Sequence, residues 1–222
     1  MSIESVIQAI AVFAIPVLFA ISLHEAAHGY IARYFGDPTA ADLGRLSINP
    51  IRHIDPFGTV MLPLALYLTV GVPFGYAKPV PVDFARLRNP RKQMAFVALA
   101  GPMANFAMGF GWLLFSLGLM FAGVQEQFFY KMAQAGVAVN AAMFVFNLIP
   151  VPPLDGGRIM TGILPLPLAR KFAEIERYSL FVFIGLIVLM QFHVLDGFLF
   201  SAMQMVTQLF MWMAIPFTLL LS

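Results

Sequence analysis

Long hydrophobic runs alternate with short polar segments along this chain. Runs with almost no charged residue cover 5–23, 57–77, 93–125, 132–154, 178–195 and 197–222. A helix needs roughly 20 apolar residues to cross the hydrocarbon core of a bilayer, and these runs are close to that length or longer. The pattern predicts an all-α polytopic membrane protein. We expect one integral-membrane domain over 1–222, with a core at about 5–160 and additional C-terminal helices at about 178–222.

Basic residues orient these runs, because Lys and Arg concentrate in cytoplasmic loops. They gather in the polar segments 33–55, 78–92 and 155–177. Both flanks of 57–77 are then cytoplasmic, and that run contains several prolines and glycines, which are poor helix formers. We therefore predict a re-entrant or interfacial hairpin at 57–77 and about five transmembrane helices in all. The N-terminus is expected outside the cell and the C-terminus in the cytoplasm.

Two segments on the predicted cytoplasmic side, 40–50 and 76–84, mix alternating apolar residues with proline and glycine. This pattern favours short strands at the membrane surface, with the prolines at edge positions. An exposed strand edge can bind an extended peptide by strand addition. Both segments are therefore candidate substrate-binding edges.

Composition supports the membrane assignment and narrows the chemistry. The chain is 60% hydrophobic and 11% charged, whereas a soluble domain carries about 25% charged residues. Its net charge of +2 comes from dispersed basic residues, which gives no support for nucleic-acid binding. The absence of cysteine excludes disulfides and cysteine-ligated metals.

The first run ends in the sequence "HEAAH", residues 24–28. Residues four apart share one face of a helix, so His24 and His28 can bind one metal ion while Glu25 reaches a water molecule bound to it. The pattern is short enough to arise by chance. However, three ionisable residues at the end of an uncharged run are costly at membrane depth, and such residues are usually functional.

A hydrolytic zinc site has three protein ligands and one open position. The candidates for the third ligand are His53, Asp55, Asp155, His193 and Asp196. Asp155 is favoured because it follows three prolines and precedes two glycines, in "NLIPVPPLDGGR" (147–158), at the end of a hydrophobic run on the same predicted side as His24. The alternative for Asp155 is a turn carboxylate paired with Arg158.

These motifs together resemble the site-2 protease family of intramembrane zinc metalloproteases, peptidase family M50. Further support comes from "GPMAN" (101–105), 36–59 and 75–83, and the resemblance covers most of 5–160. Many members carry a PDZ domain or a CBS pair. This chain shows neither, so it resembles the short membrane-only members.

The resemblance implies a role for each matching residue. His24, His28 and Asp155 would bind one Zn²⁺ per chain, and Glu25 would be the general base. Asn105 would hold the substrate backbone or stabilise the oxyanion; the alternative is a hydrogen bond between helices. The resemblance also makes His53 and Asn147 neighbours of the active site. Asn140 lies seven residues before Asn147, so the two share a helix face. Polar contacts between helices are the alternative for all three, and packing is expected for His193.

The predicted function is zinc-dependent hydrolysis of peptide bonds in transmembrane substrates near the cytoplasmic side of the bilayer, as in regulated intramembrane proteolysis. The expected partners are single-span membrane proteins and the lipid bilayer, and the expected location is the cell membrane. The alternative is a metal-ion or proton transporter that uses the same His, Glu and Asp residues. A scaffold that binds metal without turnover is a third possibility. Oligomeric state leaves no signal in the sequence.

Overall fold

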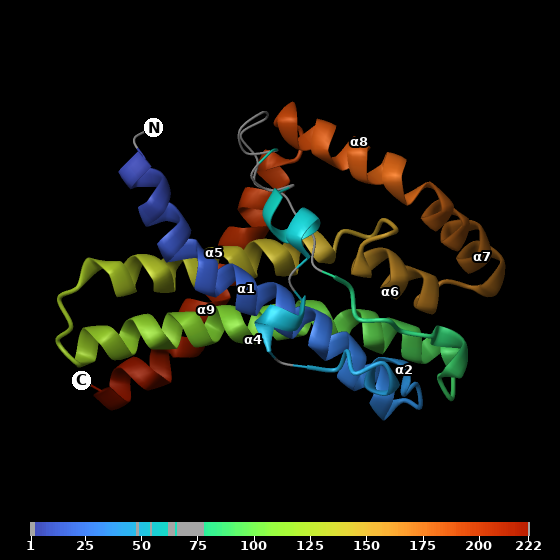
Figure 1. Ribbon diagram of the computed structural model, residues 1–222, viewed down its shortest axis with the longest axis horizontal. Helices are drawn as coiled ribbons and strands as arrows, with labels where there is room; N and C mark the ends of the chain where they lie inside the picture. Colours follow the sequence, from blue (N-terminus) through green and yellow to red (C-terminus); the bar gives the residue numbers. More distant parts are fainter. Residues whose placement is uncertain (1–2, 48, 54, 62–64, 66–77, 222) are drawn as a thin grey trace.

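The computed structural model describes residues 3–47, 49–53, 55–61, 65 and 78–221. Its longer helices are α1 (Ile3–Tyr34), α4 (Pro90–Phe121), α5 (Gln127–Asn147), α8 (Ser179–Gln191) and α9 (Asp196–Leu221) (Figure 1). Its shorter helices are α2 (Thr39–Asp42), η1 (Pro50–His53), η2 (Pro56–Met61), η3 (Phe84–Arg86), α6 (Asp155–Ile163), α7 (Leu166–Glu174) and η4 (Ile175–Tyr178). No strand occurs in the described ranges, so the predicted all-α class is confirmed there.

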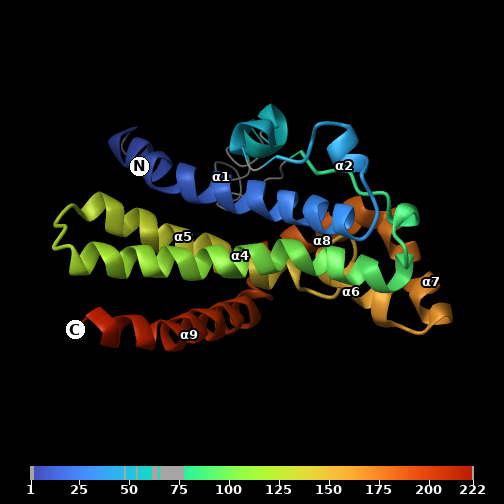
Figure 2. The same ribbon diagram turned by 90° about the horizontal axis from the view of Figure 1, so that it is seen from below.

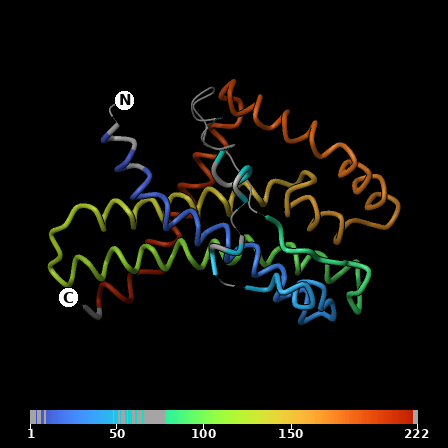
Figure 3. The backbone as a smooth tube through the Cα atoms, in the orientation of Figure 1, coloured from blue at the N-terminus to red at the C-terminus, as the bar shows by residue number. Residues whose placement is uncertain are grey.

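The helices form three layers. The antiparallel pair α4 and α5 is the middle layer, with α1 on one side and α9 on the other (Figure 2). The chain path in Figure 3 shows α1 crossing this pair at an angle. Phe210 of α9 is completely buried, with its ring centroid 4.9 Å from that of Phe106. Gly109 of α4 makes room for it, because a Cβ there would lie 2.8 Å from the Phe210 ring. The C-terminal helix therefore belongs to the packed core.

Three of the described helices are long and apolar enough to cross a membrane, over Ile10–Tyr34, Pro90–Phe121 and Asp196–Leu219. The predicted count of about five is not confirmed. The run 178–195 forms a helix of only 13 residues, α8. At 1.5 Å per residue it is about 20 Å long, which is too short for a hydrocarbon core of about 30 Å. Most of the predicted hairpin at 57–77 lies outside the described residues.

The positions of the chain ends differ from the prediction. The beginning of α1, the α4–α5 turn and the end of α9 all lie at the same end of the molecule (Figure 2). The sequence placed the termini on opposite sides because it counted 178–195 as a complete crossing. Since α8 is short, α9 returns toward the end from which α1 starts.

The predicted surface strands are also wrong where the structure describes them. Part of 40–50 is the helix α2, followed by a turn in which Gly44 adopts a φ of +63°. Residues 78–83 are extended but form no ladder. Pro79 and Pro81 have no N–H to share with a neighbouring strand, and side chains bind other backbone groups of this segment.

Candidate metal centre

The two histidines of α1 and the first residue of α6 meet inside the helix bundle. The Nε2 atoms of His24 and His28 are 3.1 Å apart. Oδ2 of Asp155 lies 3.2 Å from Nε2 of His24 and 3.3 Å from Nε2 of His28. The three atoms form a nearly equilateral triangle. Among the described residues, this is the group of His, Asp and Glu side chains that is close enough to bind one metal ion.

Hydrogen bonds on the far side of each imidazole define its tautomer. Nδ1 of His24 lies 2.6 Å from Oδ1 of Asn105, and Nδ1 of His28 lies 2.7 Å from the carbonyl oxygen of Val97. Both partners are acceptors in this arrangement, so each Nδ1 carries the proton and donates it. In the tautomer with the proton on Nδ1, the Nε2 atom of each ring presents the lone pair that can bind a metal ion. Partners of this kind orient metal-binding histidines.

A bound cation would balance the acceptor atoms that meet in this triangle. Oδ2 of Asp155 is buried and makes no hydrogen bond, although both Nε2 atoms lie within 3.3 Å. With both rings in this tautomer, three acceptor atoms face one another. In a tetrahedral zinc site with bonds of about 2.0–2.1 Å, neighbouring ligand atoms lie about 3.3 Å apart. The donor set and its spacing fit a zinc-sized cation with one open position.

Asp155 is placed by the two glycines that follow it. Gly156 and Gly157 allow the approach of α6 to the preceding turn, because a Cβ on either would collide with backbone atoms of residues 148–152. Their small size, rather than freedom to turn, is what this position requires.

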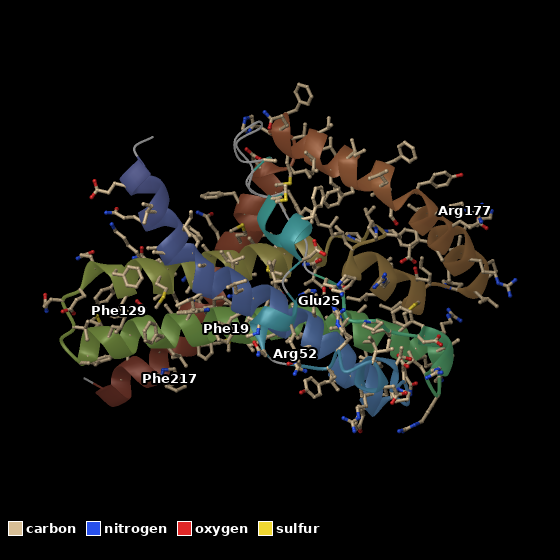
Figure 4. The ribbon with its side chains drawn as sticks, in the orientation of Figure 1. Phe19, Glu25, Arg52, Phe129, Arg177 and Phe217 are labelled. Atoms are coloured by element: carbon tan, nitrogen blue, oxygen red, sulfur yellow. The ribbon has the colours of Figure 1, made fainter. Side chains whose placement is uncertain are left out.

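Glu25 is bound to a different part of the chain. Its Oε2 atom accepts a hydrogen bond of 2.8 Å from the backbone N–H of Val80. Along the long axis of the molecule, Glu25 lies between Phe129 near one end and Arg177 near the other (Figure 4). The carboxylate that is adjacent in sequence to the first histidine is therefore partly buried and lies near the middle of the long axis.

Comparison with known proteins identifies the family. The model of peptidase family M50 matches residues 12–139 and 121–192, which together make up more than half of the chain. This chain belongs to peptidase family M50. The family resemblance of the sequence motifs is thereby confirmed, and family membership supports peptidase activity.

Individual relatives agree with this assignment. The M50 chain is 38% identical over 183 residues to "Putative zinc metalloprotease YwhC" of Bacillus subtilis (strain 168), covering 78% of each protein. It is 30% identical over 191 residues to "Putative zinc metalloprotease Rip2" of Mycobacterium tuberculosis (strain ATCC 25618 / H37Rv), covering 83% of this chain and 68% of the relative. A protein of the same name from Mycolicibacterium smegmatis is 27% identical over 176 residues, covering 77% and 64%. No solved structure matches the chain.

Asn105 of this M50 peptidase sits behind His24. Its side chain is completely buried. Its Nδ2 donates to the carbonyl oxygen of Ala20 at 3.1 Å and to Oδ1 of Asn140 at 3.0 Å. Asn140 in turn donates to the carbonyl oxygen of Gly136 at 2.9 Å. The two asparagines therefore form a polar chain across α1, α4 and α5 that ends on the imidazole of His24, which is the interhelical arrangement considered as an alternative.

The other sequence candidates whose side chains the structure describes lie outside the triangle. Asn147 donates to the carbonyl oxygen of Met143, one turn back in α5, at 3.0 Å. The side chain of His53 lies outside what the structure describes. Asp55 accepts bonds from the amides of Phe57 and Gly58 at the start of η2.

Two alternative pairings can also be assessed. His193 and Asp196 pair with each other at 2.6 Å in the exposed turn between α8 and α9. Arg158 pairs with Glu176 at 2.9 Å, so in the described contacts its ion-pair partner is this residue of η4 and not Asp155.

Gly101 of α4 has a role that the motif "GPMAN" did not reveal. A Cβ at this position would lie 2.6 Å from Nε2 of His24 and would also collide with His28. Nothing larger than hydrogen fits between α4 and the two imidazoles.

We expect Gly101→Ala to displace the imidazoles and to weaken metal binding by about 10-fold or more, the range reported for changes behind metal ligands. Metal titration of the purified protein measures this. Gly111→Ala is the matched control, because nothing lies within 4 Å of its Cβ position on the same helix. Equal metal affinity of the two variants would contradict the close approach.

Proposed function

We propose that this M50 chain is a zinc-dependent intramembrane endopeptidase that hydrolyses peptide bonds of transmembrane substrates. The triangle formed by His24, His28 and Asp155 carries the proposal, because its three atoms supply three of the four ligands of a tetrahedral zinc site. The names of the relatives, which specify zinc metalloproteases, agree with zinc as the ion. One Zn²⁺ per chain would be held by the two Nε2 atoms and Oδ2.

Each protein residue has a distinct task in the proposed reaction. Bound zinc supplies the Lewis acidity that makes a water molecule a nucleophile at neutral pH. Glu25 takes the proton from the attacking water and passes it to the nitrogen of the leaving amine. Asn105 accepts the Nδ1 proton of His24 and thereby directs Nε2 toward the ion, with Asn140 holding the Asn105 amide in turn. We assign these two asparagines to ligand orientation.

The proposed substrates are single-span membrane proteins. The residues of the triangle lie on α1 and α6, and α1 is one of three described helices that are long and apolar enough to cross a bilayer. A substrate helix hides its peptide bonds in i→i−4 hydrogen bonds, so it must unwind locally before attack. The basic polar segments favour a multi-pass orientation in the cell membrane with the active site toward the cytoplasm.

A liposome assay tests the function. Purified protein is reconstituted with a fluorescent single-span reporter, and zinc is removed and restored. We expect reporter cleavage that disappears with the metal and returns when zinc is added. Zinc and proton flux are recorded in the same vesicles, because a transporter would use the same side chains. Flux without cleavage would replace the protease proposal with the transporter, and zinc binding with neither would favour the scaffold.

A further inference from the structure

The extended segment 78–83 crosses α1 next to Glu25, and Arg45 anchors its beginning. Nη2 of Arg45 donates to the carbonyl oxygens of Lys78 and Pro79, at 3.2 and 3.4 Å. Arg45 is itself placed by the turn after α2, where its backbone N–H bonds to the carbonyl oxygen of Ala40 at 2.8 Å. One nitrogen of the guanidinium thus bridges two successive carbonyl oxygens and ties the beginning of the segment to the turn after α2.

Asp37 anchors the other end of the segment. Its Oδ2 atom accepts the backbone N–H of Asp83 at 2.7 Å, and its Oδ1 atom accepts the amide and the hydroxyl of Thr39. The Asp37 side chain is almost completely buried. Burial raises the pKa of Asp37, but the hydrogen bonds from Thr39 and Asp83 lower it by more, so the carboxylate is charged at neutral pH. A buried carboxylate with three donors is a rigid anchor.

Between the two anchors, Val80 contacts the face of α1 that carries Glu25. Its backbone N–H donates to Oε2 of Glu25 at 2.8 Å, and its side chain is only 6% exposed. Gly29 lies four residues after Glu25 and so shares its helix face. A Cβ at Gly29 would lie 2.8 Å from Cγ1 of Val80 and 2.9 Å from Cδ1 of Leu46. The missing side chain at Gly29 lets the segment lie directly on α1.

We propose that Arg45 and Asp37 are positioning residues for the M50 reaction, because they clamp segment 78–83 so that the Val80 amide holds the carboxylate of Glu25 in place. The inference rests on the proposed role of Glu25 as the general base. One carboxylate oxygen is bound to a fixed amide, and the other is left to receive the proton of the attacking water. Neither Arg45 nor Asp37 contacts the three candidate metal ligands in the described hydrogen bonds and ion pairs.

Loosening the clamp is expected to reduce turnover without affecting the metal. Misplacement of a catalytic group by about 1 Å costs about 100-fold in rate. We expect Arg45→Gln and Asp37→Asn to lower kcat by at least 10-fold, with KM within 2-fold and one zinc per chain. Arg45→Lys keeps the charge but lacks the planar guanidinium that places Nη2, so it should recover only part of the rate. Arg170→Gln, which removes an exposed arginine of α7, is the matched control and should leave kcat unchanged.

A labelling experiment tests the clamp without any turnover. The chain has no cysteine, so Val80→Cys introduces a single thiol whose reaction with a maleimide reports exposure of the segment. We expect slow labelling in the otherwise unaltered chain and several-fold faster labelling when Arg45→Gln or Asp37→Asn is added. Gln125→Cys, in the exposed α4–α5 turn, should label at the same rate in every background.

The outcomes separate this inference from the function on which it rests. Faster labelling together with unchanged kcat would overturn the positioning role and leave the protease intact. A rise in kcat would also overturn it, because the segment would then block Glu25. If the unaltered chain cleaves nothing, the proposed function fails, while labelling still reports on the clamp. Gly29→Ala pushes Val80 away without changing a charge, so it must reproduce the loss of kcat and the faster labelling if the arginine variant does not fold.

Discussion

Replacement of Glu25 by glutamine is expected to abolish peptide-bond cleavage while one zinc ion per chain remains bound. Glutamine has nearly the same shape, and its carbonyl oxygen can accept the Val80 N–H that Oε2 accepts at 2.8 Å. The bundle and the three metal ligands are therefore unchanged. What disappears is a group able to take a proton from water. A general base contributes about 10²–10⁴-fold to the rate, so cleavage should fall by at least that factor.

The measurement is reporter cleavage in liposomes, with metal analysis of the same preparation. Glu126→Gln is the matched control, because it makes the same chemical change at an exposed residue before α5. Its rate and metal content should equal those of the unaltered protein. Normal cleavage by Glu25→Gln would mean that another group accepts the proton and that the assignment of the base is wrong.

Replacement of Asp155 by asparagine is expected to remove both the metal and the activity. Oδ2 of Asp155 faces both Nε2 atoms at 3.2 and 3.3 Å and provides the negative charge of the triangle. An amide of the same size is neutral and is a much weaker ligand. Changes behind a metal ligand cost about 10–100-fold in affinity, and loss of a ligand should exceed this range.

This expectation is tested by zinc titration and reporter cleavage. The results are compared with those for Glu25→Gln. The glutamine variant should retain metal, whereas Asp155→Asn should lose metal and cleavage together. Asp196→Asn is the control, since Asp196 pairs with His193 in an exposed turn. If Asp155→Asn binds zinc as tightly as the unaltered chain, Asp155 is not a ligand, and the mechanism built on the triangle fails.

Most of the metal triangle could be predicted from the sequence. The spacing of His24 and His28 was sufficient to place both on one helix face. Asp155 was favoured among five candidates because prolines and glycines surround it and because the charge pattern put it on the same side as the histidines. The folded chain brings these three together, with His193 and Asp196 paired elsewhere. The roles of the three as metal ligands remain predictions that the experiments above test.

Other features of the site could not be predicted from the sequence. Gly101 and Gly29 are ordinary small residues in a hydrophobic chain, and their importance comes from the side chains that approach them. Val97 contributes only a carbonyl oxygen, a group that every residue possesses. The proline-punctuated segment 78–83 was predicted to be a strand, but its backbone partners are side chains of distant residues.

Properties set by near neighbours in the chain were determined by the sequence alone. The long hydrophobic runs indicated a helical membrane protein. The four-residue spacing of "HEAAH" indicated a pair of metal-binding histidines. Only the tertiary structure decided that α8 is too short to cross, that α1 begins and α9 ends at the same end of the molecule, and which atoms orient each imidazole. The physical reason is the distance along the chain over which each interaction acts. Helix periodicity and burial preference act over a few residues, whereas the approach of α1, α4 and α6 depends on which side chains leave room for one another.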